Sequence, residues 1–138
     1  MNDPRQNPVW LEGSCTCGTV RFRVLDDFDY AQNCHCSQCR KATGSAFKPF
    51  GGIAAEKLDQ VSGGDSLLHI GGPIDHDVRC AMCGAFLYSV VQSGKRVHVA
   101  FGSLEGRPSR LPDAHIFVGS KADWFEINDE LPQHEGFP

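Results

Sequence analysis

The chain has 138 residues, of which 41% are hydrophobic and 22% charged, so it can form one domain with a buried core. The net charge is −4 and the longest basic run is the pair Arg40-Lys41, which argues against a surface dedicated to nucleic acid or acidic membranes. No apolar stretch approaches the length of about 18 residues that spans a membrane, and the N-terminus is not of the secretory kind. We therefore expect neither a membrane span nor a signal peptide, and we expect the protein in the cytoplasm.

Short apolar runs between 15 glycines and 8 prolines predict a single, mainly β domain over residues 1–138. Residues 1–10 are expected to be a loose lead-in, and residues 19–24 alternate apolar and polar side chains as a half-buried strand does. Residues 33–45 are expected to form a loop with at most a helical turn. Residues 121–127 are expected to be a short helix or an extended tail. Further strands are expected at residues 46–54, 66–70, 77–80, 86–91, 96–100 and 115–118.

The seven cysteines fall into three tight clusters. They read Cys15-x-Cys17, Cys34-x-Cys36-x-x-Cys39 and Cys80-x-x-Cys83. An odd number in a reducing compartment does not suit a disulfide framework, and buried structural thiols would not explain the clustering. Spacers of two residues let both thiolates of a tight turn reach one ion. The spacing therefore predicts metal sites, with zinc as the metal.

One Cys-x-Cys and one Cys-x-x-Cys together supply the four sulfurs of a closed, structural zinc site. The four residues are Cys15, Cys17, Cys80 and Cys83. Such an ion would join the start of the domain to its middle, and structural zinc in small domains binds with roughly 10–16 kcal/mol. Another partition, in which the remaining cysteines share ligands with these pairs, stays open.

Three cysteines remain, namely Cys34, Cys36 and Cys39. Catalytic zinc sites keep one coordination position open, whereas structural sites are closed. Three thiolates on Zn²⁺ leave a net charge of −1, which disfavours activation of water but tolerates one more soft donor, such as a substrate thiolate. The alternative is a closed site whose fourth ligand is His35, His69, His115 or another residue. His35 lies between two cysteines, where a strand-like turn would point it away from the ion.

Four segments resemble one known family. They read GSCTCGTVRF (13–22), NCHCSQCRKATGSAF (33–47), RCAMCGAFLY (79–88) and HIFVGSKADWFEI (115–127). Together they are similar to the glutathione-dependent formaldehyde-activating enzyme family, and all seven cysteines have counterparts at the family's spacings. The resemblance extends from about Gly13 to Pro138. Centromere protein V shares the domain in a chromosomal role.

The resemblance implies a β-tent fold, in which short antiparallel sheets lean together around two zinc sites. It implies that the Cys-x-Cys and Cys-x-x-Cys pairs hold a structural zinc and that the Cys34/Cys36/Cys39 cluster holds a labile, catalytic one. The family's reaction is the addition of glutathione to formaldehyde, which gives S-hydroxymethylglutathione. Candidate contacts to the two carboxylates of glutathione lie beside the three-cysteine cluster. They are Arg40, Lys41, Ser45 and Lys48, although surface basic residues mostly make no specific contact.

Our first hypothesis is a zinc-dependent carbon–sulfur lyase that forms or cleaves the adduct of a thiol such as glutathione with formaldehyde or another small aldehyde. The alternatives are a non-catalytic, zinc-stabilised binding module and a glutathione carrier. A nucleic-acid-binding module would need a basic arm or aromatics set among Lys and Arg, which the sequence lacks. The expected partners are a small-molecule thiol and aldehyde, with neither nucleic acid nor membrane, and a homo-oligomer stays open.

Overall fold

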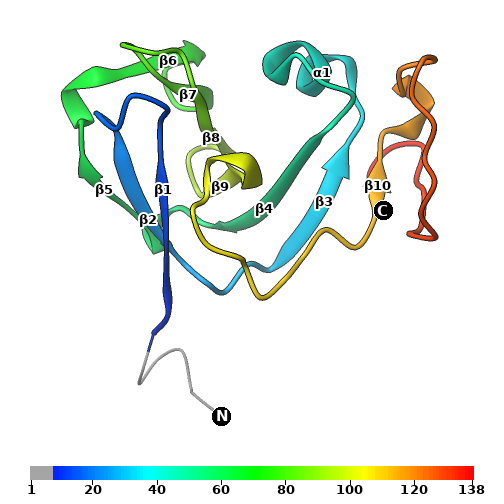
Figure 1. The fold of residues 1–138 in the computed structure, drawn as a ribbon, viewed down its shortest axis with the longest axis horizontal. Coiled ribbons are helices and arrows are strands. Elements are labelled where there is room, and N and C mark those ends of the chain that lie inside the picture. The colour runs from blue at the N-terminus through cyan, green and yellow to red at the C-terminus, as the bar shows by residue number, and fades with distance from the viewer. Residues whose placement is uncertain (1–7) are drawn as a thin grey trace.

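Two β-sheets and one short helix make up the computed structural model, which describes residues 8–138 (Figure 1). The elements are β1 (Trp10–Ser14), β2 (Arg21–Leu25), β3 (Tyr30–Cys34), α1 (Ser37–Thr43), β4 (Lys48–Ala54), β5 (Leu58–Ser62), β6 (Leu67–Gly71), β7 (His76–Cys80), β8 (Phe86–Val91), β9 (Arg96–Ala100) and β10 (His115–Ile116). Short 3-10 turns lie at Ala55–Lys57, Gly64–Ser66, Phe101–Ser103 and Val118–Ser120. The mainly β class is confirmed.

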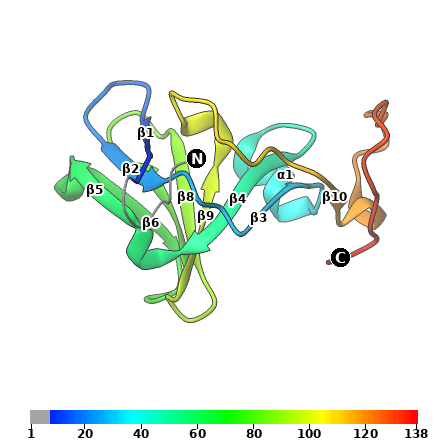
Figure 2. The ribbon, with the colours of Figure 1, turned by 90° about the horizontal axis from the view of Figure 1, so that it is seen from below.

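The smaller sheet has the strand order β1-β2-β5, and the larger one has the order β10-β3-β4-β9-β8-β7-β6. Neighbouring strands are antiparallel except β10, which runs parallel to β3. Figures 1 and 2 place the small sheet at one end of the molecule and β10, with the C-terminal segment, at the other. None of the helices described is long and apolar enough to cross a membrane.

The main core fills the space between the two sheets. In β2, Phe22 and Val24 are buried while the arginines between them face outward, which confirms the alternation seen in the sequence. Ile53 and Val99 of the larger sheet belong to the same buried cluster. A Cβ on Gly13 would lie 2.2 Å from the Phe22 ring, so the glycine lets β1 pack directly over that ring.

Three strands were not predicted, because pairing and not local pattern makes them strands. Strand β3 lies partly in the segment expected to be a loop, and its YAQNC sequence is extended because β4 and β10 pair with its two edges. Strands β1 and β5 are held by β2 in the same way. Of the expected lead-in, residues 1–7 lie outside the described residues and Trp10 begins β1.

The segment 121–127 forms neither a helix nor a strand. It follows the last 3-10 turn, and the ammonium of Lys121 donates hydrogen bonds to the carbonyls of Ala122 and Phe125. The extended-tail expectation therefore describes this segment better than the helical one.

Candidate metal centres

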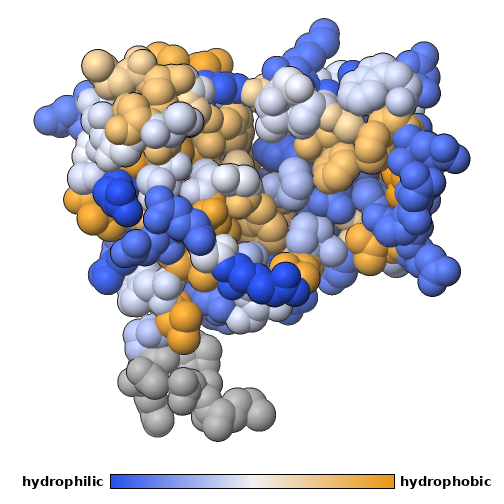
Figure 3. All heavy atoms as spheres, viewed as in Figure 1, coloured by the Kyte–Doolittle hydropathy of each residue, from blue (hydrophilic) through white to orange (hydrophobic). Residues whose placement is uncertain are grey.

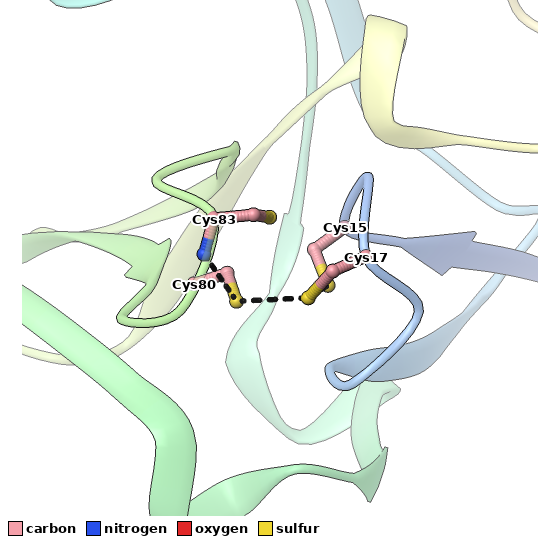
Figure 4. Close-up of side chains that lie close together, drawn as sticks. All are labelled: Cys15, Cys17, Cys80 and Cys83. Carbon is pink, nitrogen blue, oxygen red and sulfur yellow. Dashed lines mark hydrogen bonds between the residues drawn. The ribbon is translucent and has the colours of Figure 1, made fainter.

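The first cysteine cluster joins the two sheets. Cys15 and Cys17 lie in the turn after β1, Cys80 ends β7, and Cys83 lies in the turn between β7 and β8 (Figure 4). All four sulfurs lie within 4.8 Å of one another. The Cys15–Cys17 and Cys17–Cys80 Sγ distances are 3.6 and 3.9 Å, and a tetrahedral zinc with bonds of about 2.3 Å sets its sulfurs about 3.8 Å apart. The donor set fits a tetrahedral ion without rearrangement.

Backbone amides surround the buried sulfurs of this cluster. The N–H groups of Met82 and Cys83 lie 3.3 and 3.4 Å from Cys80 Sγ, and the N–H of Val20 lies 3.2 Å from Cys15 Sγ. Amide donors stabilise a thiolate and not a thiol, because a thiolate accepts hydrogen bonds. These amides would therefore stabilise both sulfurs as thiolates once a metal has displaced their protons.

The two exposed thiols of the cluster are shifted in the same direction. Backbone N–H donors, that of Ala85 first and that of Cys17 second, lower the pKa of Cys83 to about 6. The hydroxyl and N–H of Thr19 lower the pKa of Cys17. Both shifts favour the thiolate form that binds metal.

The second cluster contains three cysteines at the junction of β3 and α1. The sulfurs of Cys34, Cys36 and Cys39 lie within 4.8 Å of one another, and no fourth His, Cys, Asp or Glu ligand atom from residues 8–138 joins the group. Cys36 is the N-cap of α1 and its sulfur accepts a hydrogen bond from the Cys39 N–H at 3.3 Å. A hydrogen bond between the Cys34 and Cys39 thiols lowers the pKa of Cys39 to about 6 and raises that of Cys34.

The histidines considered as a fourth ligand lie elsewhere. His35 is fully buried, and its Nε2 lies 2.8 Å from Nδ1 of the buried His115. The carboxylate of Asp129 lies 2.9 Å from Nε2 of His115. Because this carboxylate accepts the Nε2 proton of His115, Nδ1 of His115 accepts the Nε2 proton of His35. His69 instead stacks on His76 with ring centroids 4.2 Å apart.

This His35–His115–Asp129 chain ties the three-cysteine loop to the C-terminal segment. Burial, followed by the proximity of His115 and Lys121, lowers the pKa of His35 to about 4, so its ring carries a single proton near neutral pH. Nδ1 of His35 is buried and has no hydrogen-bond partner in the described part of the chain. The histidine inside the CHCSQC motif therefore positions the loop and points away from its sulfurs.

A cavity of about 340 Å³ opens beside the three-cysteine cluster. Its walls come from α1 and from β6 and β7, and Figure 3 shows the surface hollowed between them. Cys39 and Lys48 lie on one side, and Asp77, Ser89 and His98 lie in register across β7, β8 and β9. We call this cavity the polar arm.

Lys48 is the cation closest to this cluster in the sheet. It is directly opposite Cys34 in the β3–β4 pairing, and only 7% of its surface is exposed. Its ammonium lies 5.5 and 5.2 Å from the ring centroids of Phe50 and Phe86. No carboxylate of residues 8–138 forms an ion pair with it. A buried cation of this kind attracts an anionic ligand.

The other residues expected to contact a substrate lie farther out. Ser45 lines a separate cavity of about 380 Å³ that it shares with Lys48, and its hydroxyl donates to the Phe47 carbonyl at 2.8 Å. Arg40 and Lys41 lie in the last turn of α1 and do not line the polar arm. Adjacency to the cysteines along the chain therefore does not by itself bring a basic side chain into this cavity.

Sequence reasoning missed His98 and its neighbours on the cavity floor. The RVHVA pattern of β9 buries Val97 and Val99 in the core, so His98 must lie on the opposite face of the sheet. That signal was present in the sequence. The orientation of His98 points to a functional site only once α1 is known to cover the same face, because an uncovered polar face would be ordinary solvent-exposed sheet.

Arg79 connects the β7–β8 turn, which carries Cys83 of the first cluster, to α1, which forms one wall of the polar arm. Its guanidinium donates to the Gly84 carbonyl at 2.9 Å and to the Ala42 carbonyl of α1. The bond to Ala42 fixes α1 against the β7–β8 turn. A wall of the cavity is therefore held by a residue next to Cys80 of the first cluster.

Comparison with known proteins agrees with this geometry. Residues 10–120 match the family described as glutathione-dependent formaldehyde-activating enzyme. A Halomonas elongata protein, provisionally named as such an enzyme, is 30% identical over 135 residues, which cover 85% of this chain and 80% of the relative. A crystal structure of a Rhodobacter sphaeroides protein superposes with a TM-score of 0.57 and 26% identity, covering 73% of this chain and 97% of that one. Since the family match spans most of the chain and contains both cysteine clusters, the chain belongs to the glutathione-dependent formaldehyde-activating enzyme family.

Proposed function

We propose that this protein is a zinc-dependent carbon–sulfur lyase that binds glutathione and forms, or cleaves, its adduct with formaldehyde or another small aldehyde. The observation that carries the proposal is the three-cysteine cluster, of which Cys39 lines a cavity that the buried Lys48 also lines. The family name and the provisional name of the Halomonas relative agree with it. In this proposal the two leaning sheets are the β-tent fold, and the protein works in the cytoplasm, where seven thiols stay reduced.

The cysteine geometry supports two zinc ions in different roles. The four-sulfur cluster has the spacing of a closed site, and in the three-sulfur cluster no histidine or carboxylate from the described residues completes the set. When bound by Cys34, Cys36 and Cys39, zinc supplies a position that takes up a thiol as its thiolate.

The reaction is an addition in which atoms and electrons balance without an oxidant or reductant. The sulfur of glutathione forms a bond to the carbonyl carbon, the carbonyl π pair moves to oxygen, and the proton lost by the thiol ends on that oxygen. Lys48 lies beside Cys39 and so can stabilise negative charge, first on sulfur and then on oxygen. Arg40, whose Nε is buried without a partner among the described residues, and Lys41 and Ser45 are proposed to contact the carboxylates of glutathione.

Exchange spectroscopy with formaldehyde and glutathione tests this function. The protein is expected to speed adduct formation, and Lys48→Met is expected to lower kcat/KM roughly tenfold to a hundredfold, as the loss of a charged contact does. Lys95→Met, which removes an exposed lysine from the turn between β8 and β9, is the control and is expected to behave as wild type. Glutathione binding without faster adduct formation would instead support the carrier, and no binding at all would support the binding module.

Cys36→Ser is expected to release one zinc and leave the fold largely intact. The three cysteines belong to one short loop and helix turn, so their ion organises little of the chain. Metal content per chain should fall by one ion while the circular dichroism spectrum stays that of the wild type. Unfolding of this variant would show that both clusters are structural.

A further inference from the structure

A second cavity, of about 440 Å³, lies on the same face of the larger sheet. Its lining includes the rings of Tyr30, Phe50 and Phe137 together with Val91, and no charged side chain. We call it the apolar arm. Its volume is in the range of pockets that bind small organic molecules, and formaldehyde would leave it empty.

The two arms adjoin. Val91 and His98 line both of them. Phe50, in the apolar arm, belongs to the buried cluster that contains Cys34 and is packed by Cys36 and Cys39. Its ring centroid lies 4.5 Å from that of His98. The wall that the two arms share therefore lies at these two rings, beside the three-cysteine cluster.

The side chain between the arms is neutral. Burial, with the neighbouring charges of Lys48 and Arg96, lowers the pKa of His98 to about 4. Its Nε2 forms a hydrogen bond of 2.6 Å with the Tyr30 hydroxyl, which occupies that nitrogen. His98, which both arms share, thus presents no charge to an apolar group bound beside it.

The arms suit different parts of one adduct. Glutathione carries an ammonium and two carboxylates, and the polar arm offers Lys48, Asp75 and Asp77. No charged side chain lines the apolar arm, so burying the carboxylates of glutathione there would cost free energy. An apolar substituent gains free energy by leaving water for such a lining.

We propose that the apolar arm binds the apolar substituent of an aldehyde, so that the favoured adduct is the hemithioacetal of glutathione with an aromatic or alkyl aldehyde larger than formaldehyde. This inference rests on the proposed function. The addition is the one written above, with the substituent carried unchanged on the carbonyl carbon.

Two thioethers of glutathione test the inference without requiring turnover. S-methylglutathione resembles the formaldehyde adduct, and S-benzylglutathione adds a phenyl ring at the position of the aldehyde substituent. Calorimetry on the full chain is expected to give a Kd at least tenfold lower for the benzyl compound, because its ring is buried in the apolar arm. Equal Kd values would overturn the inference and leave glutathione binding intact. Failure of both compounds and of glutathione itself to bind would overturn the proposed function.

Substitutions test whether the preference for the benzyl compound comes from the apolar arm. Gln32 lines the apolar arm and not the polar arm, so Gln32→Trp is expected to fill it and bring the two Kd values within about twofold. Phe137→Ala removes a ring that is 73% exposed, which does not endanger the fold, and is expected to reduce the preference severalfold. Val61→Trp, at an exposed position of β5, is the control and should keep the wild-type ratio. A wild-type ratio in both Gln32→Trp and Phe137→Ala would place the benzyl group elsewhere and overturn the assignment.

Discussion

Replacing Cys80 with serine is expected to release one zinc and to unfold the domain near physiological temperature. Cys80 is fully buried and its cluster joins the turn after β1 to the turn between β7 and β8, so the ion would link both sheets. Structural zinc contributes roughly 10–16 kcal/mol in small domains, whereas a whole domain is stable by only about 5–15 kcal/mol. The stabilisation lost with that ion is therefore comparable to the entire stability of the fold.

Metal analysis and a thermal melt measure this effect. Met82→Ser is a matched control, because Met82 lies in the same turn with 72% of its surface exposed and its sulfur is not in the cluster. The control should retain both ions and the wild-type melting temperature. A cooperative, native-like melt of Cys80→Ser without its zinc would contradict the structural role.

His115→Leu is expected to lower the free energy of unfolding by about 2–4 kcal/mol. Leucine is similar in size but cannot accept the Nε2 proton of His35, which would stay buried without an acceptor, and Asp129 would lose its partner. The loop that carries the three cysteines would also lose its tie to the C-terminal segment. We therefore expect a chelator to remove the ion of that cluster faster than from the wild type.

Denaturant titration and chelator kinetics together distinguish anchoring of the loop from general destabilisation. Asp129→Asn keeps an oxygen acceptor and should lose less stability than His115→Leu. His69→Leu removes an exposed, stacked histidine and serves as the control. Unchanged metal release in His115→Leu would show that the histidine chain does not hold the loop.

The grouping of the cysteines could be predicted because coordination chemistry acts through short spacings. Each pair or triplet spans at most six residues, so a short segment of sequence determines which sulfurs can share an ion. The structure brings the seven sulfurs together as four and three, as the sequence indicates, and not in the mixed partition left open. Strands β8 and β9 were also predicted with their observed bounds, since FLYSVV is a short apolar run, RVHVA alternates, and glycine-containing turns lie beside both.

The cavity could not be predicted because it depends on register between distant strands. Lys48 is opposite Cys34, and His98 is opposite Ser89, only because β3, β4, β8 and β9 pair as they do. The same limit applies to Arg40 and Lys41, which follow Cys39 in sequence but do not line the polar arm. Closeness to the cysteines along the chain indicated candidate glutathione contacts. Only the tertiary structure shows that, of these candidates, Lys48 lines the polar arm.

The pairing of β10 with β3 has a consequence for the nascent chain. His35 and His115 are 80 residues apart, and a ribosome adding about 5–20 residues per second needs roughly 4–16 s to travel that distance. Throughout that interval the segment with Cys34, Cys36 and Cys39 exists without the strand and the histidine that later enclose it. During synthesis, therefore, β10 and His115 give these three sulfurs no protection from oxidation, and their reactivity is that of cysteines in an incomplete chain.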